Sequence, residues 1–198
     1  MDHNGMPTSA VIKRLSAIPW CRTLLESPEW TSIRFRSRVP KASAKDSYFA
    51  ETLKTQRTIR SCTALRPIGE SKRGKDGIYV DELRILFELG NGVNGWLKIA
   101  HGGFVVTMLD EAMGLLLSHN VEVRFSKGIQ TYDGIGIFTA YLNTTYKKPV
   151  PTPSTVLCTV KILRRERNKI YLRATIEDGE GTVFTTAEGM FVETGSKL

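Results

Sequence analysis

The stretch AHGGFVVTMLDEAMGLLLSHN, residues 100–120, decides the fold because it places a histidine and two glycines directly before a long apolar run. Its pattern predicts a helix from about Gly103 to Ser118 that is apolar nearly all round, and such a helix is buried by other elements. One stripe of this helix is small or polar and consists of Gly103, Thr107, Asp110 and Gly114, with Glu111 and Ser118 beside it. A buried carboxylate is unfavourable unless it is compensated, so the Asp110–Glu111 pair predicts a functional role.

Strand patterns flank the helix on both sides. Upstream, IYVDELRILFELG (78–90) alternates apolar and charged residues and predicts a half-buried strand. Four further strands are expected downstream, at 135–150, 154–166, 168–178 and 182–193. Their short connections predict that consecutive strands are antiparallel neighbours. The fold class is therefore α+β, an antiparallel sheet of five or more strands with one long helix to cover.

The chain of 198 residues is long enough for one ordinary domain, which we expect at 78–195, preceded by an N-terminal extension at 1–77. Amphipathic patterns predict short helices at 8–26 and 46–58 in that extension. The rest of the extension is expected to form loops.

The net charge of +8 lies entirely in the N-terminal part of the chain. Residues 1–80 hold 15 basic and 7 acidic side chains, whereas residues 81–198 hold 13 of each. A nucleic-acid-binding protein is expected to cluster its basic residues on a folded face, so no nucleic-acid partner is predicted. The excess fits a solvated surface or, second, the attraction of an anionic substrate.

Cofactors, metals and membranes leave no pattern in the sequence. Cys21, Cys62 and Cys158 are odd in number and lack a C-x-x-C pair, so neither disulfides nor a zinc site are expected. The start of the chain lacks the apolar core of a secretory signal, and the longest apolar run is interrupted by two acids. We therefore expect no metal, no cofactor and no membrane insertion.

The last three residues, Ser196-Lys197-Leu198, match the peroxisomal address S-K-L, which an import receptor reads. Peroxisomal localisation, with that receptor as a partner, is therefore expected.

The start of the predicted helix offers chemistry together with Asp110. Backbone N–H groups at a helix N-terminus have no intrahelical acceptor, so Gly102 or Gly103 could polarise a carbonyl while the carboxylate activates water. Asp110 lies roughly 10 Å along the axis from Gly103, which is too far for one carbonyl. Two antiparallel helices related by a twofold axis would bring the two groups together. The sequence thus predicts an obligate homodimer, or a dimer of dimers, with composite sites.

The motifs HGGFVVTMLDEAMG (101–114) and TAYLNTTYKKPVP (139–151) resemble the hotdog-fold acyl-CoA thioesterases, specifically the PaaI-like, thioesterase-superfamily-member branch. The closing AEGMFVE is also similar, and the resemblance covers about residues 80–195. Residues 1–75 resemble the helical leader of fungal members. The resemblance implies a hotdog fold, in which the sheet curls around the helix and a dimer interface holds the thioester.

The resemblance implies site residues position by position. Asp110 would be general base or nucleophile, Gly102 and Gly103 would hold the oxyanion, His101 would shape that hole, and Thr139 would orient the water. Glu111 competes with Asp110 for the role of base, and Asp110 is favoured; Glu111 is otherwise a substrate contact.

Candidate substrate contacts also lie on and after the strand that carries Thr139. They are Asn143, Lys147 and Lys148, the two lysines being placed to meet the phosphates of the CoA group. Coenzyme A is part of the substrate, so no separate cofactor is implied. The predicted reaction is hydrolysis of an acyl-CoA to free acid and CoA. Two alternatives remain: a hotdog enoyl-CoA hydratase or dehydratase, and a non-catalytic acyl-CoA-binding protein.

Overall fold

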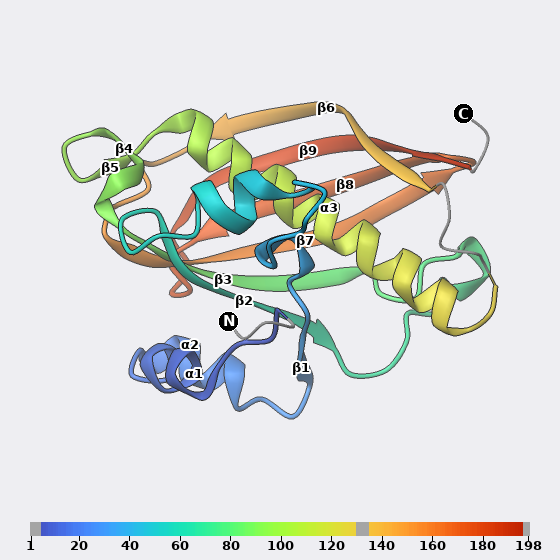
Figure 1. The fold of residues 1–198 in the computed structure, drawn as a ribbon, viewed down its shortest axis with the longest axis horizontal. Helices are drawn as coiled ribbons and strands as arrows, with labels where there is room; N and C mark the ends of the chain where they lie inside the picture. The colour runs from blue at the N-terminus through green and yellow to red at the C-terminus, as the bar shows by residue number, and fades with distance from the viewer. Residues whose placement is uncertain (1–4, 130–134, 196–198) are drawn as a thin grey trace.

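The computed structural model of the protein describes residues 5–129 and 135–195. The sheet has seven antiparallel strands. It wraps around one long helix, α3 (Gly102–Ser126), as Figure 1 shows. The strands are β1 (Trp30–Ile33), β2 (Ile59–Pro67), β3 (Glu82–Leu89), β6 (Gly136–Tyr146), β7 (Ser154–Glu166), β8 (Lys169–Glu177) and β9 (Val183–Thr194). Their order across the sheet is β1-β2-β3-β7-β8-β9-β6. The predicted hotdog arrangement is confirmed.

The remaining elements are short, apart from α3. The helices are α1 (Ser9–Leu15), α2 (Pro19–Leu25) and α3 (Gly102–Ser126), and a separate hairpin joins β4 (Asn94–Trp96) to β5 (Ile99–Ala100). Single helical turns occur at Arg36–Arg38, Tyr48–Thr52, Gly74–Asp76 and Asn91–Val93. In the described residues, no helix is both long and apolar enough to cross a membrane.

Helix α3 extends eight residues beyond the predicted end at Ser118. Polar side chains beyond Ser118 do not end the helix, as Asn120 shows. Asn120 is buried, and its side chain donates to Leu116 O and Val80 O while it accepts from the N–H groups of Tyr79 and Val80. A buried amide with its hydrogen bonds satisfied is compatible with a helix interior.

The sheet is packed on both faces, and strand β3 shows how. Its residues Leu83, Ile85, Phe87 and Leu89 face the core around α3, as the alternation predicted. Leu86 points the other way into a second cluster with Leu15 of α1 and Leu24 of α2. The two N-terminal helices therefore cover the outer face of the sheet (Figure 1).

The expectation that residues 1–77 contain only helices and loops is wrong, because β1 and β2 lie there and extend the sheet beyond β3. Strand β2 shows no alternation in the sequence because it is covered on both faces: Ser61, Cys62, Thr63, Ala64 and Leu65 are all at most 2% exposed. The expected helix at 46–58 is reduced to the turn at Tyr48–Thr52, and Pro19 begins a separate helix within 8–26.

The predicted pairing of β6 with the next strand is also wrong. Strand β6 pairs with β9 and forms one edge of the sheet, whereas β7 lies between β3 and β8. The connection does not turn back but passes the N-terminal end of α3. There Ala100 N–H donates to Val150 O at 2.9 Å, and Thr152 N–H donates to Lys98 O at 3.0 Å. The other predicted pairs, β7 with β8 and β8 with β9, are confirmed.

Candidate active site

Asp110 and Thr139 form the centre of the candidate site. Asp110 lies on α3 and Thr139 on the edge strand β6, and the Thr139 hydroxyl donates to Asp110 Oδ1 at 2.7 Å. Both line a pocket of about 400 Å³ together with Tyr48, Phe49, Val106, Thr107, Glu111 and Leu142. The hydroxyl fixes the orientation of the carboxylate, which leaves the second oxygen for a water molecule or a substrate atom.

The predicted oxyanion donors lie at the first turn of α3. His101 is the N-cap, and its Nδ1 accepts a hydrogen bond from Gly103 N–H at 3.0 Å. Since that N–H is already used, Gly102 N–H is the one of the pair that has no acceptor within the described residues. An accepting Nδ1 places the proton of the neutral ring on Nε2. The structure thus separates the roles of the two glycines.

Tyr146, at the end of β6, closes one side of this helix start. Its hydroxyl donates to Gly102 O at 2.9 Å. A Cβ added at Gly102 would lie 3.2 Å from the Tyr146 hydroxyl oxygen. A separate pocket of about 350 Å³ is lined by Tyr146, Lys147 and Lys148 together with Gly102 and Val105. The predicted lysines therefore lie beside the predicted oxyanion donor, with exposed side chains.

Glu111, next to Asp110, has a very different environment. Ser37 from the N-terminal region donates a hydrogen bond to Glu111 Oε1. Burial raises the pKa of Glu111 to about 7; Ser37 opposes this, and the carboxylates of Asp46 and Asp110 add to it. The two adjacent acids therefore contact different parts of the protein. Asp110 contacts Thr139 of β6, and Glu111 contacts Ser37 of the N-terminal region.

The two halves of the predicted chemistry do not meet within one chain. Asp110 and Gly102 are eight residues apart on the same helix, which is about 12 Å along the axis. A base and an oxyanion donor that act on one carbonyl must each lie about 3 Å from their target atoms. The helix therefore carries both groups but at a separation that a single carbonyl cannot bridge.

Other predicted contacts lie apart from these pockets or in different surroundings. Asn143 is exposed on β6, opposite Glu188 of β9, and lines neither of the two pockets above. No group of three or more side chains suited to a metal ion occurs within residues 5–129 and 135–195. Residues 196–198 lie outside the described residues, so the peroxisomal address stays a prediction.

Several pocket residues were not predicted from the sequence. Ser37, Tyr48 and Phe49 come from the N-terminal region, and Ser37 reaches Glu111 across 74 positions of the chain. No local pattern marks such contacts. Tyr146, by contrast, lies within the stretch TAYLNTTYKKPVP (139–151), so a motif in the sequence marks its position.

A family model described as "Thioesterase superfamily" matches residues 97–185, which contain α3, β6, β7 and β8. We call residues 97–185, which this family model matches, the thioesterase region. This thioesterase region contains every predicted site residue, from His101 to Lys148. The fungal assignment stays a prediction.

The curated relatives that match the chain are also named as thioesterases. Acyl-coenzyme A thioesterase THEM4 of Rattus norvegicus is 31% identical over 109 residues, which are 54% of this chain and 41% of the relative. Acyl-coenzyme A thioesterase THEM5 of Homo sapiens is 29% identical over 109 residues, 54% of this chain and 39% of the relative. The chain therefore spans about two fifths of the length of these relatives.

Solved structures of similar proteins include a thioesterase superfamily protein at 23% identity, with a TM-score of 0.47, covering 66% of this chain and 53% of that chain. A hypothetical thioesterase of Streptococcus pneumoniae, crystallised with coenzyme A, is 17% identical, with a TM-score of 0.47, and covers 60% of this chain and 85% of that chain.

Proposed function

We propose that the protein hydrolyses the thioester of an acyl-CoA to a free acid and CoA. Asp110 removes a proton from a water molecule, whose oxygen attacks the thioester carbon. The negative charge that develops on the carbonyl oxygen is stabilised by Gly102 N–H, and the carbon–sulfur bond then breaks. The departing thiolate is a good leaving group, since a thiol has an ordinary pKa of about 8.5, so the reaction requires no strong general acid and no cofactor.

The observation that carries this proposal is the hydrogen bond from Thr139 to Asp110. It holds a carboxylate that lines a pocket in one orientation, and among the described residues the second oxygen has no hydrogen-bond donor. The thioesterase relatives support the same chemistry, since they are named as acyl-coenzyme A thioesterases. Nucleophilic attack by Asp110 on the thioester carbon, followed by hydrolysis of the anhydride, is the variant that the same geometry permits.

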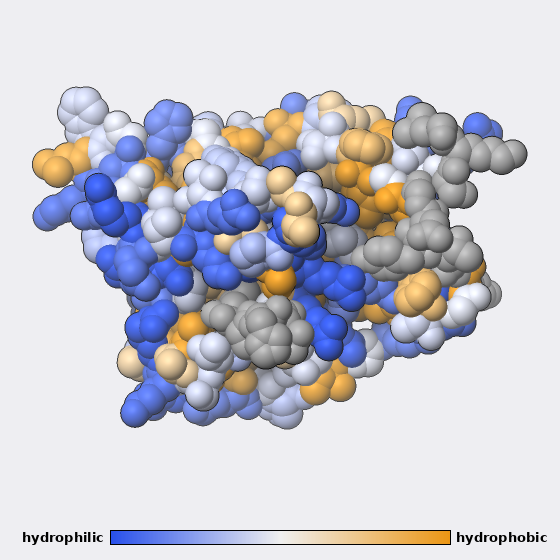
Figure 2. All heavy atoms as spheres, in the orientation of Figure 1, coloured by the Kyte–Doolittle hydropathy of each residue, from blue (hydrophilic) through white to orange (hydrophobic). Residues whose placement is uncertain are grey.

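We propose further that a second copy of the chain completes the site. Strand β6 forms a free edge of the sheet, and the exposed side chains Phe138, Tyr141 and Tyr146 are 55%, 41% and 54% accessible. Figure 2 shows apolar residues along the upper edge of the molecule, where β6 runs in Figure 1. An unpaired edge with apolar side chains favours pairing with another strand. A twofold axis there would bring Asp110 of one copy toward Gly102 of the other.

Lys147 and Lys148 are proposed to bind the phosphates of CoA. Their backbone N–H groups both donate to Phe184 O, at 2.8 and 3.0 Å, which fixes the segment while the side chains remain exposed beside Gly102. Cations at this position would hold the head group while the thioester reaches the helix start.

A panel of acyl-CoA esters tests the proposed activity, with free thiol measured by a colorimetric reagent and the products by mass spectrometry. Release of CoA together with the unchanged acyl chain as an acid is the expected result. A change in unsaturation without thiol release would instead support the hydratase or dehydratase. Tight binding without any product would support the non-catalytic binding protein.

Mixed dimers test the composite site. Gly102→Pro removes the N–H, and the extended His101, with φ −61° and ψ 134°, accepts a following proline at the first helical position. The Tyr146 hydroxyl, 3.2 Å from a Cβ at this position, must then move slightly, so thermal unfolding of the variant is measured as well. Gly102→Pro and Asp110→Asn chains should each be inactive. An equal mixture should recover about a quarter of wild-type turnover, since half of the dimers then hold one intact site. No recovery after subunit exchange, demonstrated independently, would contradict a shared site.

A further inference from the structure

Glu111 lies between two pockets, and the proposed hydrolysis does not use it. It lines the pocket that holds Asp110 and Thr139, and it also lines a neighbouring pocket of about 480 Å³. That second pocket follows α3 from Glu111 to Glu122, which is about 17 Å along the helix axis. An acyl group attached at the Asp110 pocket would therefore pass Glu111 on entering the second pocket.

The carboxyl group of Glu111 has one oxygen held and one oxygen unused. Oε1 accepts the hydrogen bond from Ser37, whereas Oε2 has no hydrogen-bond partner in residues 5–129 and 135–195. The side chain is only partly exposed to solvent, and its environment raises its pKa. A polar atom in such a position is unfavourable unless a ligand or water meets it.

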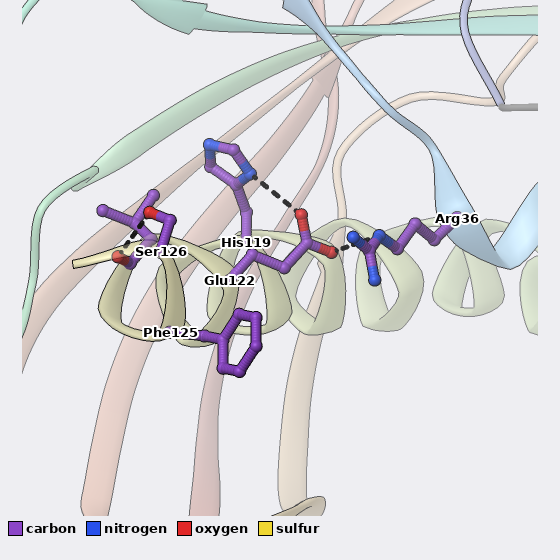
Figure 3. Close-up of a pocket in the computed structure, with 6 residues that line it drawn as sticks. Arg36, His119, Glu122, Phe125 and Ser126 are labelled. Atoms are coloured by element: carbon purple, nitrogen blue, oxygen red, sulfur yellow. Dashed lines mark hydrogen bonds and ion pairs between the residues drawn. The ribbon is translucent and has the colours of Figure 1, made fainter. Parts of the chain in front are cut away.

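Glu122 provides the contrast on the same helix. Its Oε1 lies 2.7 Å from Arg36 Nε, and its Oε2 lies 3.8 Å from His119 Nδ1. Figure 3 shows the carboxylate between these two side chains. Each oxygen of Glu122 therefore has a basic side chain within 4 Å, Arg36 at Oε1 and His119 at Oε2. Only one oxygen of Glu111 is engaged.

The wall of the second pocket changes in character along its length. Near Glu111 it is polar, with Ser37 and Asp46, and farther on it includes the apolar side chains of Leu115, Val121 and Ile137. Gly114 lies between these parts, and a Cβ built there would meet no atom within 4 Å. The pocket therefore suits an acyl group with a polar substituent close to the thioester and an apolar remainder.

The charges around Glu111 decide which polar substituent fits. The carboxylates of Asp46 and Asp110 face it, while the guanidinium of Arg38 opposes them. Of the cations that line the pocket, Lys41 is held by Asp46, Arg36 pairs with Glu122, and Lys45 is exposed. A second carboxylate on the acyl group would be repelled here. A hydroxyl fits both protonation states of Glu111, because it can donate to the carboxylate or accept from the carboxylic acid.

From this geometry we propose that Glu111 and Ser37 form a specificity site that selects acyl-CoA esters with a hydroxyl group on the acyl chain, within a few carbons of the thioester. The proposal rests on the proposed thioesterase function and names its substrate class. An unsubstituted acyl chain would cover Glu111 Oε2 and leave it without a hydrogen-bond partner. The transition state for that ester would therefore be bound less tightly.

The test compares kcat/KM for 3-hydroxyacyl-CoA and unsubstituted acyl-CoA esters of equal chain length. For the wild-type protein the ratio should be about tenfold or more, in favour of the hydroxy ester. Glu111→Leu should lower the ratio to about 1, because the group that meets the hydroxyl is gone. Glu111→Gln should retain part of the preference, since an amide still donates and accepts hydrogen bonds.

Glu122→Gln is the matched control, because it changes an acid of the same helix and pocket whose oxygens are already engaged. Its ratio should equal that of the wild type. Circular dichroism and thermal unfolding of each variant check that the fold is kept. A wild-type ratio near 1, or an unchanged ratio in Glu111→Leu, would overturn the proposal.

Binding separates this proposal from the proposed hydrolysis. Calorimetry on the Asp110→Asn variant measures the affinity for both esters without turnover. If the hydroxy ester binds more tightly and this difference is lost on adding Glu111→Leu, the specificity site stands even if the wild type releases no thiol. Equal affinities would overturn it. Formation of enoyl-CoA from the hydroxy ester would overturn the role of Glu111 in selection and assign it to dehydration.

Discussion

The two parts of the chain on either side of residue 78 are built in different ways. From residue 78 onward, strands β3, β7, β8 and β9 follow local alternation, and α3 follows a helical pattern. Before residue 78, β2 joins the sheet through its backbone ladder with β3, and α1 and α2 pack on the outer face. The segment between β1 and β2 reaches α3 through side-chain contacts that are far apart in the sequence. Ser37 reaches Glu111, and Arg36 reaches Glu122.

This difference affects the site directly. The thioesterase region supplies the groups proposed to carry the chemistry, and the N-terminal region supplies one wall of the pockets beside them. The residues of the thioesterase region belong to motifs that are visible in the sequence. The residues of the N-terminal region reach the pockets only through the fold of the chain. Substitutions in the two regions should therefore have different consequences.

Removal of the proposed base should have the largest effect. Asp110→Asn should lower kcat for acyl-CoA hydrolysis by about 10³-fold while the melting temperature changes little, because an amide keeps the shape but cannot accept the proton. Thiol release and thermal unfolding measure the two quantities. Turnover within a few fold of wild type would show that the thioesterase region does not carry the base at this position.

The N-terminal region should respond in stability rather than in chemistry. Arg38 is 2% exposed, and its guanidinium donates to Phe49 O, Leu53 O and Ile59 O at 2.9–3.0 Å. Arg38→Leu should lower the free energy of unfolding by about 3 kcal/mol, since buried carbonyl groups lose their donors. Urea denaturation measures this. Arg36→Leu, which removes a half-exposed ion pair of the same helical turn, is the control and should cost less than about 1 kcal/mol.

Where the two regions meet, stability should depend on pH. The pKa of Glu111 is raised to about 7 from an ordinary value of 4.5, so the folded protein holds a proton that the unfolded chain releases. This contribution is fully present below about pH 4.5 and is lost as pH rises through 7. Wild-type stability should therefore fall by about 2 kcal/mol relative to Glu111→Gln between pH 5 and pH 8. Urea denaturation across this pH range measures the difference, and parallel curves for the two proteins would contradict the raised pKa.

The exposed lysines of the thioesterase region should give the smallest effect. Lys148→Ala should raise KM for an acyl-CoA about threefold to tenfold with little change in kcat, and the difference should shrink at high salt because exposed charges are screened. Steady-state kinetics at two ionic strengths measure this. Lys169→Ala, at the start of β8, is a control that should leave KM unchanged.

The sequence predicts the fold of the second region well, and the reason is physical. Leu83, Ile85 and Phe87 alternate because one face of β3 meets α3. Asp110 could be located because an acid within an apolar helix requires compensation. Strand β2 escaped prediction because cover on both faces removes its alternation, and Ser37 escaped because nothing local records a contact across 74 positions.

The buried guanidinium of Arg38 has one more consequence. The Arg38 guanidinium donates to the carbonyl groups of residues 49, 53 and 59. We therefore expect the N-terminal wall of the pockets to be ordered before a ligand binds. Preorganisation of this kind reduces the entropic cost of association. Entry of the acyl group should then follow a single kinetic phase, limited by diffusion into an existing space and not by a rearrangement of the protein.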